Sequence, residues 1–315
     1  MTLNIKSLKK YTYLYLGAMI AVLTLLYSCG DSGKSSTSGK PYIVTTTGMI
    51  ADIVANIAGD SATVEAIMQP GVDPHLYKAS QGDLKKIMNA DYIFYNGLHL
   101  EGKMGEILEK QTHSKPVIAL GDSITSSKII RLTDNTYDPH IWFDVALWKE
   151  ATEISLKNLS ALNPDNAAYY EQNADRYIKE LDELDRWVRA EILTIPQNRR
   201  VLITAHDAFS YFGRAYGIEV RGLQGISTLS EIGLRDVTNL VDFIIEKDIP
   251  AVFVESSVSD KSLKAVIAGV NKKGRNLTVG GNLFSDAMGE KGTPEGTYTG
   301  MVKHNVNTIV SALKK

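Results

Sequence analysis

Hydrophobic and polar residues follow two alternating periods along the chain from residue 41 onward. Short β-branched or apolar runs predict strands, and the segments between them have helical spacing. The predicted strands are 42–46, 63–68, 90–96, 116–120, 200–204, 219–223, 250–255 and 278–283. The predicted helices are 49–58, 80–89, 103–111, 209–216, 230–248, 261–272 and 299–313, with Ser80 and Ser230 at two N-termini. Strands separated by helices predict an α/β fold with parallel sheets covered on both faces.

A longer helical pattern follows Asn163-Pro164, an N-cap followed by proline at the first helical position. Up to Pro196, apolar residues recur every three or four positions: Tyr170, Ala174, Tyr177, Leu181, Leu184, Val188 and Ile192. The pattern predicts one helix of about 30 residues and about 45 Å. Because this exceeds a small domain, we expect a spine (163–196) joining two α/β lobes (41–162 and 197–315), rather than a coiled-coil arm. Ligands would then bind in the cleft between the lobes.

The N-terminal segment has the features of a secretory signal. Three lysines and no acidic residue precede an uncharged, mostly apolar run at 14–27, which is short for a permanent membrane span. Ser28 directly precedes Cys29, and this junction resembles the lipobox of bacterial lipoproteins. We therefore predict a signal peptide at 1–28 and a lipid on Cys29, the alternative being an incidental cysteine after an ordinary signal. The Gly/Ser-rich segment 29–40 predicts a flexible tether, so we expect an extracytoplasmic protein anchored to a bacterial membrane.

Composition and motif searches exclude several classes of protein. The 34 basic and 36 acidic residues give a net charge of −2, without the basic excess of a nucleic-acid-binding domain. A single cysteine excludes a disulfide framework, a cysteine zinc finger and an iron–sulfur ligand set. The sequence lacks a phosphate-binding GxxxxGK[ST] loop, a GxGxxG fingerprint after a strand, a GxSxG elbow and an HExxH motif. The six histidines remain as candidate metal ligands.

Four residues are candidates for a metal site. His75 and His140 each end an Asp-Pro-His motif, where proline stiffens the turn and the aspartate can accept from the imidazole or cap the next helix. His206 follows the strand 200–204, and Asp286 follows the strand 278–283. We expect all four at strand ends, two in each lobe. A single residue of this kind is more often a surface or capping residue than a ligand, but together the four suit Zn²⁺ and, with less preference, Mn²⁺ or Fe²⁺.

The other histidines and one glutamate have weaker signals. His99, His113 and His304 lie in a Gly-containing loop, a polar loop and the last predicted helix, and we expect no metal role for them. Glu255 ends the predicted strand 250–255. We expect it to support the metal site from behind, and the alternative is that it caps the following turn.

Several segments together carry a resemblance to one family. They are 73–75 (DPH), 138–144 (DPHIWFD), 204–212 (TAHDAFSYF), 253–257 (FVESS) and 284–289 (FSDAMG). In this order they resemble the signature segments of the zinc/manganese solute-binding lipoproteins of ABC importers, the metal-receptor cluster with a rigid helical spine. The resemblance spans essentially the whole chain after the signal. It implies two pseudo-symmetric lobes and one interlobe divalent metal ion held by His75, His140, His206 and Asp286.

The resemblance also implies a function and a choice of metals. We expect a monomeric receptor, not an enzyme, that captures its metal cargo and delivers it to an ABC permease. Family members have His or Glu at the third ligand position, and the Glu versions resemble manganese receptors, so His206 favours zinc. The segment 121–137 lacks the His-rich loop that zinc receptors of Gram-negative bacteria often carry, which keeps manganese second and iron third. Because imidazole binds metal when neutral, affinity should fall as the pH drops through about 6.5.

Two other functions compete with a metal receptor. A secreted zinc hydrolase would need an open coordination position with bound water and a nearby general base, which four protein ligands would not leave. A surface adhesin is compatible with an anchored tether, since lipoproteins of this family have often been labelled so, but the sequence encodes no evident partner surface.

Overall fold

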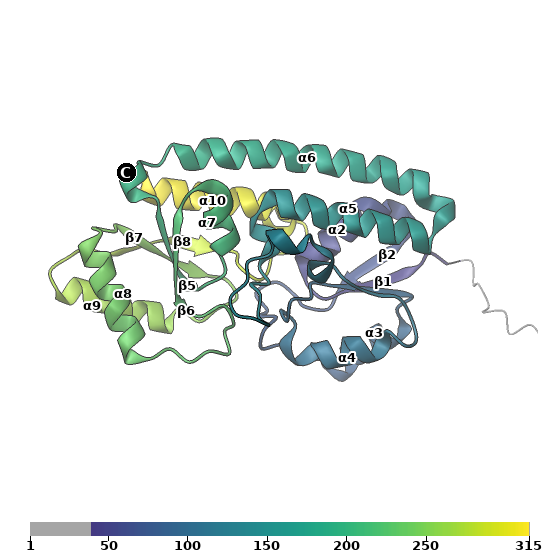
Figure 1. The fold of residues 1–315 in the computed structure, drawn as a ribbon, viewed down its shortest axis with the longest axis horizontal. Helices are drawn as coiled ribbons and strands as arrows, with labels where there is room; N and C mark the ends of the chain where they lie inside the picture. The colour runs from purple at the N-terminus through teal and green to yellow at the C-terminus, as the bar shows by residue number, and fades with distance from the viewer. Residues whose placement is uncertain (1–38, 315) are drawn as a thin grey trace, which may run out of the picture. The chain divides into compact units, whose positions relative to one another are not determined.

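The computed structural model describes residues 39–314 (Figure 1). The predicted signal peptide (1–28), Cys29 and nearly all of the predicted tether (29–40) lie outside the described residues. Within residues 39–314, no helix has both the length and the apolar character that a membrane span requires. From Lys40 onward the chain forms a single compact unit.

The first half of this unit (residues 41–162) contains a parallel sheet with the strand order β2-β1-β3-β4. Neighbouring residues of a strand point to opposite faces, so Ile43 and Val44 of β1 enter different cores, as do Ile93 and Phe94 of β3. In Figure 1, α3 and α4 lie below the sheet and α2 above it. The elements are β1 (Tyr42–Thr45), α2 (Gly48–Ala58), β2 (Thr63–Ala66), α3 (Gln81–Asn89), β3 (Tyr92–Tyr95), α4 (Gly105–Gln111) and β4 (Val117–Ala119).

The second half (residues 197–314) contains two parallel ladders, β5-β6 and β7-β8. Because β5 also lies alongside β7, the four strands follow the order β6-β5-β7-β8. Helices α8 and α9 pack together over a separate apolar core of this half. The elements are β5 (Val201–His206), α7 (Ser210–Tyr216), β6 (Glu219–Gln224), α8 (Leu234–Glu246), β7 (Ala251–Glu255), α9 (Lys261–Lys272), β8 (Thr278–Leu283) and α10 (Tyr298–Leu313). The predicted α/β fold with parallel sheets is confirmed.

A long helix connects the halves. After α5 (Val145–Leu162) and a short 3₁₀ turn at Pro164–Asn166, α6 runs over Ala167–Leu193. It packs against α2 and α5 of the first half and against α7 and α10 of the second (Figure 1). All seven apolar positions of the predicted stripe are buried. The predicted spine helix is therefore confirmed, although the proline belongs to the preceding turn and the helix begins three residues later.

Two local differences from the sequence prediction have physical causes. Helix α5 was not predicted, because its buried face includes Thr152 and Ser155, which interrupt the apolar spacing. Their hydroxyls donate to backbone carbonyls four residues earlier, at 2.9 and 2.8 Å, and so are satisfied inside the core. Helix α8 begins at Leu234 rather than Ser230. The N-cap residue is Gly233, whose backbone N–H donates to the side chain of Asp236 at 2.8 Å.

Candidate metal centre

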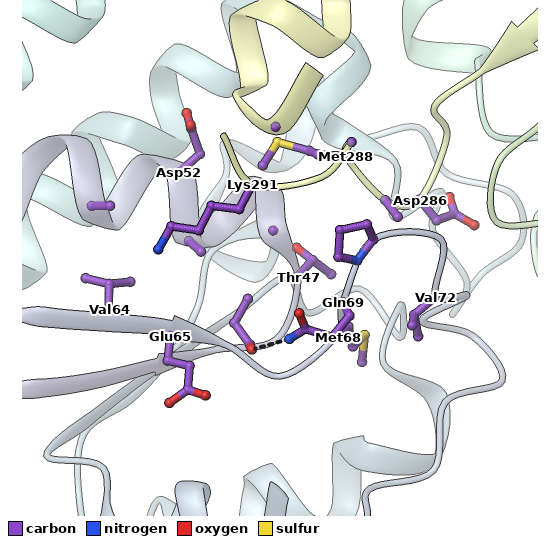
Figure 2. Close-up of a pocket in the computed structure, with 18 residues that line it drawn as sticks. Thr47, Asp52, Val64, Glu65, Met68, Gln69, Val72, Asp286, Met288 and Lys291 are labelled. Carbon is purple, nitrogen blue, oxygen red and sulfur yellow. Dashed lines mark hydrogen bonds between the residues drawn. The ribbon is translucent and has the colours of Figure 1, made fainter. Parts of the chain in front are cut away.

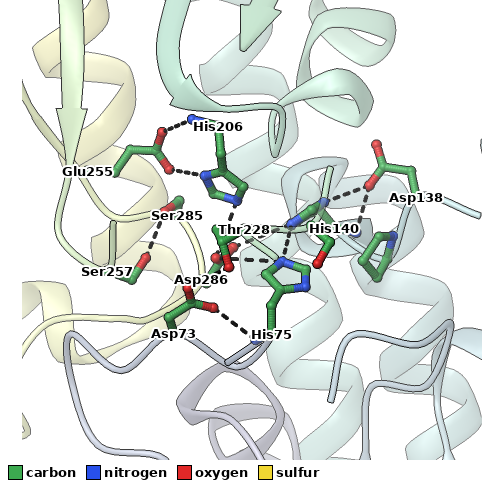
Figure 3. Close-up of polar contacts among 12 residues, drawn as sticks. Asp73, His75, Asp138, His140, His206, Thr228, Glu255, Ser257, Ser285 and Asp286 are labelled. Atoms are coloured by element: carbon green, nitrogen blue, oxygen red, sulfur yellow. Dashed lines mark hydrogen bonds and ion pairs between the residues drawn. The ribbon is translucent and has the colours of Figure 1, made fainter. Parts of the chain in front are cut away.

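The four candidate ligands lie together and are all buried (Figure 3). His75 and His140 come from the first half, and His206 and Asp286 from the second. His206 is the last residue of β5, and Asp286 lies three residues beyond β8. The carboxyl ends of parallel strands are the usual place for ligand sites in α/β proteins, and the C-terminal half follows this rule.

His140 is an exception to the predicted placement at strand ends. It lies 21 residues beyond β4, directly before the 3₁₀ turn Ile141–Phe143. The local structure is set by Asp138, whose Oδ1 accepts from the backbone N–H of His140 at 3.0 Å and from its ring Nδ1 at 2.7 Å. His75 is likewise separated from β2 by a loop of eight residues. The first half therefore supplies its histidines from loops rather than from strand ends.

The two Asp-Pro-His motifs are used differently. Asp138 binds the imidazole of its own motif, as the sequence allowed. Asp73 binds the backbone of His75 instead of its ring: one carboxylate oxygen accepts from the backbone N–H of His75 at 2.9 Å. The other oxygen accepts from the hydroxyl of Thr228 at 2.6 Å. Thr228 belongs to the loop after β6, so the first motif is linked to the opposite half of the molecule. Sequence reasoning missed Thr228, which no motif distinguishes from its Ser- and Thr-containing neighbours.

Glu255, at the end of β7, lies behind His206. Its carboxylate accepts from the ring Nδ1 of His206 at 2.6 Å and from the backbone N–H of the same residue at 2.9 Å. An ionised carboxylate can only accept, so the proton of a neutral His206 is held on Nδ1 and the Nε2 lone pair faces Asp286. Asp138 has the same effect on His140. Carboxylates in this position typically fix the orientation and tautomer of histidines that bind metals.

The spacing of the donor atoms fits a single small cation. One ligand atom from each residue lies within 4.8 Å of all the others. The Nε2 atoms of His75 and His140 are 3.3 Å apart, and His206 Nε2 is 3.3 Å from Asp286 Oδ2. The remaining carboxylate distances are 3.5 Å to His140 and 3.9 Å to His75. A tetrahedral zinc ion with bonds of about 2.0–2.1 Å separates its ligands by about 3.3–3.4 Å.

Three of these donors lack other partners. Among the described residues, His206 Nε2 and both carboxylate oxygens of Asp286 are buried without a hydrogen bond. The 3.3 Å contact between them is an ion pair without hydrogen-bond geometry. Buried polar atoms are rarely left unpaired, because each costs free energy. A bound cation would satisfy His206 Nε2 and at least one of the Asp286 oxygens.

Burial and the charges of neighbouring groups have opposite effects on the pKa values of His75, His206 and Asp286. Burial lowers the pKa of His75 to about 4, although the Asp286 carboxylate opposes the shift. Burial would also lower the pKa of His206, but the Asp286 and Glu255 carboxylates outweigh it and raise that pKa well above its usual 6.5. Burial would raise the pKa of Asp286, yet His206 and the other imidazoles hold it well below its usual range. In the metal-free protein, His206 and Asp286 therefore form an ion pair beside a neutral His75.

The other three histidines lie apart from this cluster. His113 is exposed in the loop after α4, and His99 is exposed in the loop after β3. His304, on α10, contacts the carbonyl of Asn282 at 3.0 Å. None of the three belongs to the group of converging donors.

A cavity of about 430 Å³ adjoins the metal centre (Figure 2). It lies between α2, the end of β2 and the loop after β8, and Asp286 is at one end of its lining. Asp52 on its α2 side is hydrogen-bonded to the hydroxyl of Tyr177 on α6 at 2.7 Å. Of the four converging residues only Asp286 lines this cavity, and the three histidines do not.

The chain matches known proteins along most of its length. The family described as zinc-uptake complex component A periplasmic (ZnuA) matches residues 43–312. The manganese-binding lipoprotein MntA of Bacillus subtilis (strain 168) is 51% identical over 303 residues, covering 95% of this chain and 99% of that protein. The zinc-binding protein TroA of Treponema pallidum (strain Nichols) is 47% identical over 296 residues, covering 94% and 96%.

The fold matches as well. The solved structure of the periplasmic zinc-binding protein TroA from Treponema pallidum has a TM-score of 0.86 at 49% identity, and the match covers 88% of this chain and 100% of that chain. The resemblance stated from the sequence motifs is thus confirmed by sequence and by structure. This chain belongs to the ZnuA family of metal-binding substrate-binding proteins of ABC importers.

Proposed function

We propose that this protein captures one divalent transition-metal ion outside the cytoplasm, with zinc preferred over manganese, and delivers it to the permease of an ABC importer. The ion would be held by His75, His140, His206 and Asp286. The observation that carries the proposal is the convergence of these four buried side chains, from both halves of the chain, at the spacing of a single coordination sphere. The unpaired Asp286 oxygens support the same conclusion.

The donor chemistry supports the preference for zinc. Three imidazole nitrogens suit Zn²⁺ well, whereas Mn²⁺ is better matched by carboxylate, carbonyl and water oxygens. Zinc also binds nitrogen donors more tightly than manganese in the general order of divalent metals. The printed names of the relatives include both metals. We therefore base the preference on the donors, and we expect manganese to bind at the same site more weakly.

The donor set supports transport rather than catalysis. Catalytic zinc usually has three protein ligands and keeps one position for water, while here four side chains converge. Besides Asp286, Glu255 also has its carboxylate next to His206. Both Glu255 oxygens already accept hydrogen bonds from His206. It is therefore occupied as a positioning group and poorly placed as a general base.

We also propose how the receptor is organised and anchored. Residues 41–162 and 197–315 would act as two lobes on the spine 163–196, and the protein would work as a monomer. A lipid on Cys29 would attach the chain to the membrane through the tether 29–40. Replacement of Cys29 by serine should release the protein from the membrane fraction and abolish incorporation of labelled fatty acid. Retention of the label in that variant would contradict the anchoring proposal.

Metal content provides the direct test. Protein purified without added metal should contain about one equivalent of zinc by elemental analysis, as expected for a buried four-ligand site. After chelation, calorimetry should detect stoichiometric binding of Zn²⁺ and weaker binding of Mn²⁺, with the two ions competing. Absence of stoichiometric uptake of either ion would overturn the proposed function, and tighter binding of Mn²⁺ would overturn the zinc preference.

Histidine variants locate the site. His75→Ala and His140→Ala should each weaken zinc binding by more than about 100-fold, because even changes behind a ligand cost about 10–100-fold. His113→Ala is the matched control, since this histidine is exposed and belongs to no cluster. Its affinity should equal that of the wild type. Equal losses in all three variants would point to non-specific histidine binding.

A further inference from the structure

The loop between β3 and the 3₁₀ turn Gly102–Met104 has an unusual backbone. Three consecutive residues, Gly97, Leu98 and His99, have φ values of 77°, 52° and 64°. The left-handed region is accessible to glycine but costly for leucine and histidine. Two such residues in succession are kept only where surrounding contacts enforce the conformation, which is common beside functional sites.

The contacts that enforce this loop converge on Glu101, which is 2% exposed. Its Oε1 accepts from the hydroxyl of Thr46 and from the backbone N–H of Asn96, both at 2.7 Å, and its Oε2 accepts from the backbone N–H of Gly97 at 3.1 Å. Burial raises the pKa of Glu101 to about 7, although the hydrogen bonds from Thr46 and Asn96 oppose the shift. The carboxylate therefore ties the end of the loop to its beginning and to the end of β1.

The same loop lies directly against both ligand-bearing turns of the first half. The side-chain amide of Asn96 donates to the carbonyl of Pro139, the residue before His140, at 3.0 Å. Gly102 packs on the carbonyl of His75 so closely that a Cβ at this position would be 2.9 Å from the oxygen. One segment thus contacts the backbone next to His140 and the backbone of His75 itself. The two ligand-bearing turns therefore share this segment as a common support.

We propose that Glu101 is a positioning residue for metal binding, which holds the loop 96–102 against the His75 and His140 turns and so sets the separation of the two imidazoles. The inference rests on the proposed function, because it assigns a role within the same metal site. Glu101 itself does not contact the ligands. It acts through Asn96 and Gly102, and the 3.3 Å distance between the two Nε2 atoms is the quantity that it controls.

Glu101→Gln tests the proposal, because it replaces one accepting oxygen with an NH₂ group that faces N–H or O–H donors. At pH 8, the variant should bind Zn²⁺ about 10-fold or more weakly than the wild type, the range seen when groups that orient ligands are changed. Its complex with Co²⁺ should show a changed visible absorption spectrum, which reports ligand geometry. Thr46→Val removes a single donor and leaves the charge, so it should fold readily and show the same changes to a smaller degree.

Glu150→Gln is the matched control. Glu150, on α5, accepts a backbone N–H and a hydroxyl from Thr125, at 2.8 and 2.6 Å, and pairs with the ammonium of Lys128 at 2.7 Å; neither partner belongs to a ligand-bearing turn. It should keep the wild-type zinc affinity and Co²⁺ spectrum. If the Glu101 and Thr46 variants melt at lower temperature yet keep both readouts, their role is only structural and the inference is overturned. If the wild type itself binds no metal, the proposed function fails and the inference fails with it.

Discussion

The three histidines of the proposed metal centre are oriented by two kinds of contact. His140 and His206 each donate from Nδ1 to a carboxylate, Asp138 and Glu255, at 2.7 and 2.6 Å. The aspartate before His75 accepts only its backbone N–H. His75 is therefore held by its turn rather than by a ring partner. The carboxylates of Asp138 and Glu255 place negative charge behind the imidazoles of His140 and His206, which favours binding of a cation at their Nε2 atoms.

Metal binding should release a proton at neutral pH. The raised pKa of His206 means that the metal-free site carries a proton there, and Zn²⁺ must displace it because only neutral imidazole binds metal. Below that raised pKa, affinity should increase with pH by up to about tenfold per unit, and it should level off above it. The fall in affinity on acidification thus begins above pH 6.5, higher than the unshifted histidine value predicted from the sequence. His75, with a pKa of about 4, does not compete for protons in this range.

Calorimetry in two buffers of different ionisation enthalpy measures this proton release directly. At pH 7 the wild type should release about one proton for each zinc ion bound. Glu255→Gln removes one of the carboxylates that raise the pKa of His206, so this variant should release fewer protons and show its fall in affinity at lower pH. Buffer-independent heats in the wild type would contradict the expected protonation of His206.

Motifs in the sequence single out the site residues, but not the contacts that link them. His75 and His140 stand out because a short motif occurs twice, and Glu255 because it ends an apolar strand. The partner of Asp73 is 155 residues away, in a loop whose composition is ordinary. Glu101 is an acid in a loop, and its burial depends on the folded positions of Thr46 and Asn96. Such long-range contacts arise from tertiary packing and leave no periodic signal.

At the level of elements, a helix is predictable when apolar residues recur along its buried face at helical spacing. Every predicted core position of α6 is buried, because aliphatic and aromatic residues recur there at helical spacing. Helix α5 is equally well formed, but Thr152 and Ser155 occupy part of its buried face. Backbone carbonyls one turn earlier satisfy their hydroxyls, a solution that hydrophobicity alone does not reveal. A helix cap is likewise predictable when its contacts are local in the sequence. Ser80 caps α3 as predicted, since Asp83, three residues later, completes a capping box.

At the level of the whole molecule, aromatic side chains join the two halves behind the metal centre. Trp142 donates from its indole N–H to the carbonyl of Ser285 at 2.9 Å, and Tyr298 donates to the carbonyl of Trp142 at 2.7 Å. Phe143 stacks on Phe209 with ring centroids 4.1 Å apart. These contacts bring the segment after His140 next to the segment before Asp286. The halves are therefore fixed to each other on the aromatic side of the ligands.

A different contact joins the halves at the Asp73 loop, where the hydroxyl of Thr228 donates to Asp73 (Figure 3). Gln224 holds the loop of Thr228 by donating to two of its carbonyls, both at 2.6 Å. Burial raises the pKa of Asp73, and the Thr228 hydroxyl opposes that shift, so the bond stabilises the charged carboxylate. Separation of the halves on this side requires that the bond break. Such a bond to a charged group contributes about 1.5–3 kcal/mol.

We therefore expect Thr228→Val to release zinc to a chelator about 10-fold faster than the wild type, as loss of that bond predicts. The four ligands are untouched, so the Co²⁺ absorption spectrum should not change. Ser227→Ala is the control, because its hydroxyl accepts only within the same loop, from the N–H of Leu229 at 3.3 Å. Stopped-flow release rates distinguish the outcomes. Equal acceleration in both variants would assign the effect to the loop as a whole, and wild-type rates in Thr228→Val would show that this contact does not limit release of the ion.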